Sequence, residues 1–287
     1  MRILLVGARG MLGRRLETAL AGIGDVIPVA RSGTSVTLDV ADSSAVDALV
    51  RGFAPSLVVN ATAWTAVDRA ESEPESAHRV NAIAPGALAS AAAAVGAAFV
   101  HVSTDFVFDG AIGRPLVESD PVNPLSVYGR TKEEGERRVR AAHPNALIVR
   151  TQWLYGPDGR HFVGTMLRLA AEGKPLRVVG DQFGAPTCTV DVAAAIVRLV
   201  RAGVTGTVHC ASKGEVSWHG FAEAIFRLAG VEYRVESIPT SGYPVPARRP
   251  ARSSLRNRIM EVTIGDDMPM WQDALAAYLA TTATSST

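Results

Sequence analysis

The sequence is poor in cysteine, in long apolar runs and in excess charge of either sign. Cys188 and Cys210 are its only cysteines and lack C-x-x-C spacing, so we expect reduced thiols in a cytoplasmic protein rather than a disulfide framework. No apolar stretch is long enough to span a membrane, and the run before Gly7 is too short for a signal peptide. We therefore expect no membrane partner.

Charge is balanced as well, because 29 Lys and Arg residues face 28 Asp and Glu residues in a chain of 287. That balance gives no reason to expect nucleic acid as a partner. The 6 histidines are scattered without metal-ligand spacing, so the residues themselves predict no metal site, and we interpret each histidine as structural or superficial. No nucleophile elbow is present, which leaves hydrolase chemistry without support.

The first half of the chain alternates short apolar runs with helical patterns. The runs are continuous rather than alternating, which is typical of parallel strands buried on both faces. Asp42 is a candidate cap for one of the helices. The pattern predicts strands at 3–6, 26–29, 57–60, 98–102 and 147–150, and helices at 11–20, 43–51, 74–95 and from the segment holding Tyr128 to about 142.

This alternation predicts an α/β fold with a Rossmann-like, doubly wound parallel sheet. We expect residues 1–150 to form a dinucleotide-binding domain that also receives later segments. After Trp153 the pattern becomes less regular and richer in turns. Residues 151–287 are therefore predicted to form mainly a smaller, loop-rich, substrate-binding lobe packed against the carboxyl edge of the sheet.

A glycine loop separates the first predicted strand from the first predicted helix. Its three glycines would allow a tight turn, close approach to a pyrophosphate, and close packing of helix on strand. The amino terminus of the helix would offer free N–H groups to the phosphates. The loop therefore predicts a dinucleotide cofactor, with contacts from Gly7, Gly10, Met11, Leu12 and Gly13.

The second predicted strand ends in Arg31 and Ser32 rather than in an acid. An acid would bind a ribose 2′-hydroxyl, whereas arginine and serine suit a 2′-phosphate. We therefore favour NADPH, with NADH as the alternative; a solvated loop charge would also explain Arg31. Later strand ends add the expected contacts Asp39, Val40, Ala61, Thr62 and Ala63.

Tyr128 and Lys132 are four residues apart and would share one helix face. A nearby ammonium and an oxidised nicotinamide would favour the phenolate, so Tyr128 is a candidate acid–base and Lys132 a further cofactor contact. Thr104, at the end of a strand, would hydrogen-bond the substrate oxygen. The alternative is an exposed helical pair, which is common in unrelated proteins. Together the three residues predict transfer of a hydride and a proton between nicotinamide and a carbonyl.

At these residues the chain resembles the extended short-chain dehydrogenase/reductases, and more specifically the dTDP-4-dehydrorhamnose reductase family. The similarity covers nearly the whole chain, and its most specific segments lie outside the cofactor-binding half. The segments that carry it are 60–68, 70–73, 103–110, 124–132, 150–155, 181–187 and 246–250.

The resemblance implies that NAD(P)H reduces the C4 keto group of dTDP-4-dehydro-L-rhamnose, giving dTDP-L-rhamnose. It makes Tyr128 the proton donor, with Thr104 orienting it and Lys132 supporting both. It also implies a substrate site formed by Thr104, Asp105, Tyr128, Trp153, Arg248 and Arg249, the two arginines facing the diphosphate. A Mg²⁺-assisted homodimer is known in parts of the family, so the resemblance alone implies Mg²⁺ and a homodimer here.

Two alternatives stay open at this point. The chain departs from the usual family pattern at Thr62, Trp64 and Phe106, which leaves room for a reductase of another dTDP-4-keto-6-deoxysugar. The other alternative is a non-catalytic, dinucleotide-binding subunit similar to the regulatory subunit of methionine adenosyltransferase. The Thr104, Tyr128 and Lys132 set favours catalysis.

Overall fold

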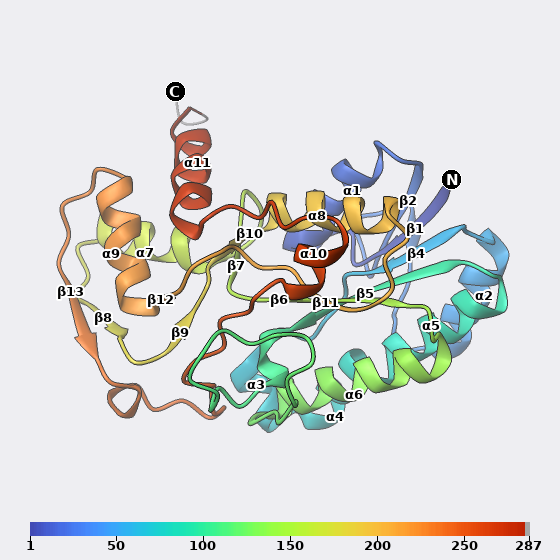
Figure 1. Cartoon of the computed structure of the whole chain (residues 1–287), viewed down its shortest axis with the longest axis horizontal. Coiled ribbons are helices and arrows are strands. Elements are labelled where there is room, and N and C mark those ends of the chain that lie inside the picture. Colours follow the sequence, from blue (N-terminus) through green and yellow to red (C-terminus); the bar gives the residue numbers. More distant parts are fainter. Residues whose placement is uncertain (285–287) are drawn as a thin grey trace.

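The computed structural model describes residues 1–284 and contains a seven-stranded parallel sheet (Figure 1). Its strands lie in the order β11-β6-β5-β4-β1-β2-β3, so the direction of winding reverses between β1 and β4. The predicted Rossmann-like, doubly wound fold is thereby confirmed. The strands are β1 (Arg2–Val6), β2 (Asp25–Ala30), β3 (Val36–Thr37), β4 (Leu57–Asn60), β5 (Ala98–Thr104), β6 (Leu147–Thr151) and β11 (Gly206–His209).

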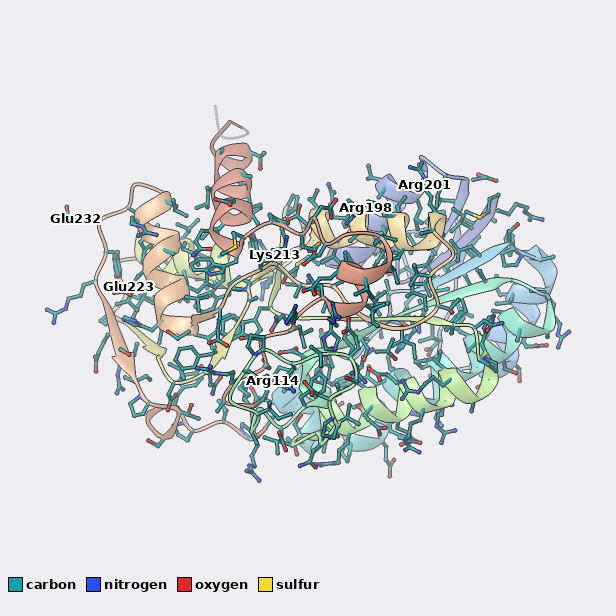
Figure 2. The ribbon with its side chains drawn as sticks, viewed as in Figure 1. Arg114, Arg198, Arg201, Lys213, Glu223 and Glu232 are labelled. Carbon is teal, nitrogen blue, oxygen red and sulfur yellow. The ribbon has the colours of Figure 1, made fainter. Side chains whose placement is uncertain are left out.

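Helices cover both faces of this sheet, as its continuously apolar strands require. Along α8, Val192, Ile196 and Leu199 pack toward the sheet, while Arg198 and Arg201 lie on the outer side (Figure 2). One face carries α1 (Met11–Leu20), α8 (Thr189–Arg201) and α10 (Arg258–Thr263), and the other carries α2 (Ser43–Phe53), α5 (Ala84–Ala94) and α6 (Val127–Ala142).

Local side-chain caps fix where two of these helices begin. The Asp42 carboxylate accepts from two backbone N–H groups at the start of α2, which confirms the predicted cap. Ser126 caps α6 by accepting from the N–H of Gly129 at 3.1 Å. The predicted helix 74–95 is continuous but changes pitch, since α4 (Pro74–His78) and α5 flank a π-helical turn at Arg79–Ile83.

The smaller lobe is built around helices that the sequence analysis did not place, and it keeps a long segment with little regular structure between β13 and α10. It consists of α7, α9 and α11 around a core rich in aromatic side chains, flanked by paired short strands. Its elements are β7 (Leu154–Tyr155), α7 (Phe162–Ala171), β8 (Leu176–Val179), β9 (Phe183–Gly184), β10 (Thr187–Cys188), β12 (Val216–Ser217), α9 (Trp218–Leu228), β13 (Val235–Ile238) and α11 (Trp271–Thr284).

The second half of the chain also contributes to the central sheet. Both α8 and β11 return to it, with β11 pairing along β6. The division into two domains stays a prediction. Residues 285–287 of the predicted second domain lie outside the described residues. Remaining short elements are α3 (Val67–Ser72) and 3₁₀ turns at Asp105–Val107 and Thr240–Gly242. Within residues 1–284, no helix is long and apolar enough to cross a bilayer.

Candidate active site

Most of the predicted cofactor residues line one cavity of about 420 Å³ at the carboxyl edge of the sheet, but Tyr128 and Lys132 are not part of its wall. Parallel strands all end at the same edge, so residues far apart in the chain meet there. The two strands at the reversal of winding, β1 and β4, end at Val6 and Asn60. Predicted residues lining the cavity are Gly7, Gly10, Arg31, Ser32, Asp39, Val40, Ala61, Thr62 and Ala63.

The glycine loop fits a dinucleotide because two of its positions have no room for a side chain. Gly7 has φ +93°, and a Cβ there would lie 2.8 Å from the Ala61 carbonyl carbon. A Cβ at Gly13 would lie 2.0 Å from the Gly7 carbonyl oxygen, so α1 can approach the loop this closely only with glycine. The open backbone and the lining described above suit a pyrophosphate at the start of α1.

Met11, Leu12 and Gly13 form the first turn of α1 rather than the cavity wall. The Leu12 side chain packs into the core, so this residue can offer the cofactor only its backbone N–H. The cofactor contacts expected from Met11, Leu12 and Gly13 stay predictions. Two residues that the sequence analysis did not select, Arg9 and Trp64, line the cavity. Arg9 lies inside the glycine loop at a position that no motif constrains, so no signal distinguished it.

The predicted reacting groups converge beside the end of β5. Thr104 ends that strand, and Tyr128 and Lys132 lie on one face of α6, the phenol in edge contact with Phe106 at 5.4 Å between ring centroids. All three predicted groups are less than a tenth exposed. The alternative of an exposed helical pair is therefore wrong.

Burial governs the acid–base properties of Tyr128. Burial raises the pKa of Tyr128 to about 12, a hydrogen bond with Thr104 opposes the rise, and the Asp105 charge adds to it. Burial also lowers the pKa of Lys132 to about 8, so the lysine stays mainly charged at neutral pH, and the expectation that it favours the phenolate stays a prediction. The phenol is thus held protonated at neutral pH, which is the form that a proton donor needs.

Asp105 is a buried carboxyl group beside these residues. Its two oxygens accept from Thr104 Oγ1 at 3.0 Å and from the Ser253 hydroxyl. Burial raises the pKa of Asp105 to about 6 despite both hydrogen bonds. Because the single Thr104 proton points at Asp105 here, it must turn before Thr104 can donate to a substrate oxygen. The predicted substrate roles of Thr104 and Asp105 stay predictions.

Trp153 joins this site to the smaller lobe through an aromatic stack. Its ring lies parallel to that of Trp218, with centroids 3.5 Å and planes 8° apart. Trp153 also has φ +45°, a left-handed conformation that is unfavourable for a bulky side chain. One indole face is therefore already covered, and only the rest of Trp153 is left for the predicted sugar contact.

The smaller lobe contains a second cavity, of about 600 Å³. Trp218 is part of its wall, so the stack connects this cavity with Trp153, just after the end of β6. No sequence motif marked these residues, since they come from separate elements. Among the lining residues are Phe162, Gln182, Trp218, Tyr243 and Arg249.

The two predicted diphosphate arginines differ in their surroundings. Arg248 is exposed, whereas the Arg249 guanidinium makes a two-pronged ion pair with Asp68, at 2.7 and 3.0 Å. Arg249 lines the second cavity as well. A diphosphate contact from Arg249 would therefore compete with Asp68, and both arginine roles stay predictions.

The residues do not fit the Mg²⁺ ion that the resemblance implies. Within residues 1–284, no group of three or more His, Cys, Asp or Glu side chains lies close enough together to hold a metal ion.

Comparison with known proteins shows similarity over nearly the whole chain. The family model for the RmlD substrate binding domain matches residues 1–284. A dTDP-4-dehydrorhamnose reductase of Burkholderia thailandensis is 41% identical over 96% of this chain and 97% of its own length. A crystal structure of such a reductase from Clostridium acetobutylicum has a TM-score of 0.94 at 43% identity, covering 99% of this chain and 100% of its own. The reductase of Bacillus anthracis, solved in complex with NADP, has a TM-score of 0.93 at 34% identity, covering 98% and 99%.

Proposed function

The chain belongs to the dTDP-4-dehydrorhamnose reductase family, and we propose that it reduces the C4 keto group of dTDP-4-dehydro-L-rhamnose to give dTDP-L-rhamnose. The observation that carries this proposal is that Trp64 lines the proposed cofactor cavity and also packs in the cluster that holds the buried, protonated Tyr128. Neither feature alone would indicate a ketoreductase, but together they provide for both halves of the reaction.

The cofactor proposed for the cavity is NADPH. The Gly7–Gly10 backbone would receive the pyrophosphate, and Arg31 and Ser32, on the cavity wall, would bind a 2′-phosphate. When bound, the cofactor supplies the hydride that goes to C4 of the sugar. NADH remains the alternative for this chain, and the choice between them depends on Arg31.

Tyr128 provides the proton. Its phenol is protonated at neutral pH, so it can donate to the C4 oxygen as negative charge develops there. Thr104, once its hydroxyl turns from Asp105, would offer a second hydrogen bond to the same oxygen. Lys132, one helical turn along α6, would bind the cofactor ribose and support the phenolate that forms.

The sugar nucleotide is proposed to lie between the reacting groups and the second cavity. Trp153 would contact the deoxysugar with its uncovered edge, and the lobe cavity would take the nucleotide end. Arg249 would reach the diphosphate by releasing Asp68. A cavity lined by aromatic side chains and one arginine suits a base linked to phosphates.

We further propose that the enzyme works in the cytoplasm and as a homodimer. The free thiols of Cys188 and Cys210 are buried and unpaired, as a reducing compartment allows. The homodimer comes from the family resemblance, and light scattering of the purified chain tests it directly.

A panel of dTDP-4-keto-6-deoxysugars tests the proposed function, with NADPH oxidation as the readout. We expect the highest kcat/KM for dTDP-4-dehydro-L-rhamnose. Faster turnover of another sugar of the panel would identify a sibling reductase. Absence of NADPH oxidation with every sugar would contradict the proposal and favour the non-catalytic regulatory subunit.

A further inference from the structure

A buried chain of hydrogen bonds leads from the cofactor cavity to the Nζ atom of Lys132. Asn60 and His101 are paired neighbours on β4 and β5, and both are completely buried. Asn60 Nδ2 lies 3.1 Å from His101 Nδ1, and His101 Nε2 lies 3.4 Å from Lys132 Nζ. At its other end, Asn60 is bound to Thr62, which lines the cofactor cavity.

The orientation of the Asn60 amide is fixed by its neighbours. Asn60 Oδ1 accepts from the Thr62 backbone N–H at 3.0 Å and from the Thr62 hydroxyl at 2.6 Å. A backbone N–H can only donate, so this atom must be the amide oxygen. The atom facing His101 is then the amide nitrogen, which donates to Nδ1.

This orientation determines the tautomer of His101. Burial, and then the charge of Lys132, hold the pKa of His101 well below its usual value, so the ring is neutral. A neutral imidazole carries one proton, and because Nδ1 accepts from Asn60 the proton is on Nε2. The N–H of His101 therefore points at Lys132 Nζ.

A charged Lys132 is a poor partner for that N–H. An ammonium has only donors, so Lys132 and His101 would face each other proton to proton. A neutral amine has a lone pair that accepts from His101 Nε2, while one of its protons still donates to the Val102 carbonyl oxygen at 2.7 Å. Compared with a lysine in water, the geometry therefore shifts the balance from the ammonium toward the amine, in the same direction as the burial that lowers the pKa of Lys132 to about 8.

We propose that His101, held by Asn60, is a positioning residue of the reaction that stabilises the neutral amine of Lys132 and so makes the lysine ammonium a better proton donor to Tyr128. After the phenol has given its proton to the sugar, an N–H bond of Lys132 breaks, an O–H bond forms on the phenolate, and the lone pair left on Nζ accepts from His101. Because Nζ is hydrogen-bonded to Val102 and His101 and not to the Tyr128 hydroxyl, the proton would pass through an intervening hydroxyl or water. The catalytic part of this inference rests on the proposed function.

The charged group next to Lys132 on the same helix opposes this lowering of the lysine pKa. Glu136, one turn further along α6, raises the pKa of Lys132. That carboxylate is itself fully buried and is bound by Arg150 on β6, by Ser103 on β5 and by Arg140 on α6. Its charge is shared with these partners, and burial outweighs its effect, since the pKa of Lys132 is lowered overall. On the other side, the Tyr128 phenol is uncharged at neutral pH.

The first test is ¹⁵N NMR of the His101 ring in the whole protein, without cofactor or substrate. We expect a neutral ring with its proton on Nε2. A proton on Nδ1, or a charged imidazolium at neutral pH, would overturn the inference. This measurement needs no variant and no activity, so failure of the proposed function would not affect it.

The second test is Asn60→Asp. Aspartate would accept from His101 Nδ1–H, so the Nε2 lone pair would turn toward Lys132 and accept from the ammonium. We expect the pKa of Lys132, followed by ¹³C NMR of its Cε, to rise by about one unit or more. The alkaline limb of the kcat profile should move upward with it. An unchanged or lowered pKa of Lys132 would contradict the inference.

His143→Gln is the matched control. His143 lies at the opposite, amino edge of the sheet, where its Nε2 contacts the Ala97 carbonyl oxygen at 2.9 Å. This variant removes a histidine that is not part of the chain from Asn60 to Lys132, so it should leave both the pKa of Lys132 and the alkaline limb in place. A matching shift in His143→Gln would show that the Asn60→Asp effect is not specific to His101.

Discussion

Single residues at this site owe their chemistry to burial as much as to identity. The spacing of Tyr128 and Lys132 was sufficient to predict that they share a helix face. The direction in which the pKa of each group moves was not predictable, because it depends on surroundings that the sequence does not show. His101 is the clearest case, since a lone histidine in a strand carries no signal of its buried partners.

Arg31 is the residue on which cofactor preference should depend. Replacement of Arg31 by alanine would remove a charged hydrogen-bond donor to the 2′-phosphate, a contact that contributes about 1.5–3 kcal/mol. We expect the Kd for NADPH to rise about tenfold or more and the Kd for NADH to change little, as measured by fluorescence titration. Equal effects on both cofactors would reject the 2′-phosphate interpretation.

Arg51→Ala is the control for Arg31→Ala. Arg51 is exposed at the end of α2 and pairs with Asp47 at 2.8 Å, and it is not among the residues lining the cofactor cavity. Its loss removes the same charge from the same half of the protein. The ratio of the NADPH affinity to the NADH affinity should therefore be the same in Arg51→Ala as in the unmodified protein.

At the scale of elements, the sequence predicted the helices and strands of the first half of the chain better than the contacts between them. Helix α6 begins at the Ser126 cap and carries Tyr128, Lys132 and Glu136 at successive turns of one face. The periodicity alone predicts that face. The π-helical turn at Arg79–Ile83, where Asn81 contacts Thr131 of α6 at 3.2 Å, has no such periodic signal.

The stack between Trp153 and the first residue of α9 is another contact between elements that no pattern predicted. Trp218→Ala would remove the ring that holds Trp153 in its left-handed conformation. We expect KM for the sugar nucleotide to rise about tenfold, equivalent to about 1.4 kcal/mol, with the Kd for NADPH unchanged. Steady-state kinetics and cofactor titration measure the two quantities separately.

Trp218→Phe distinguishes positioning from folding in this prediction. Phenylalanine keeps a flat ring against Trp153 and should recover a large part of the lost KM effect. If Trp218→Ala lowers the melting temperature but leaves KM for the sugar nucleotide unchanged, the stack serves only the stability of the lobe.

At the scale of the whole molecule, the chain crosses between its two parts more than once. The sequence predicted the sheet because its apolar runs are local signals. It did not predict the helical lobe, whose core combines residues as distant as Tyr155, Phe221 and Trp271. It also did not predict the Arg249–Asp68 ion pair, which links residues 181 positions apart. Contacts of this kind leave no periodic trace in a sequence.

This arrangement places the cofactor cavity in one part of the molecule and the proposed nucleotide cavity in the other. Thr104 ends β5, Tyr128 lies on α6, and Trp153 follows β6 and stacks on Trp218 of the second cavity. A hydride from one side and a proton from Tyr128 would then meet at a single sugar carbon. The central claim of this account is therefore that the Tyr128 hydroxyl supplies the proton.

The most direct measurement of that claim is the turnover of Tyr128→Phe with dTDP-4-dehydro-L-rhamnose and NADPH. Tyr233→Phe is its control, since the Tyr233 hydroxyl donates to the Lys174 carbonyl oxygen at 2.6 Å in the smaller lobe. We predict that kcat of Tyr128→Phe falls about 100-fold or more while NADPH binds as before, and that Tyr233→Phe retains full turnover. Near-normal turnover of a folded, NADPH-binding Tyr128→Phe would contradict the account.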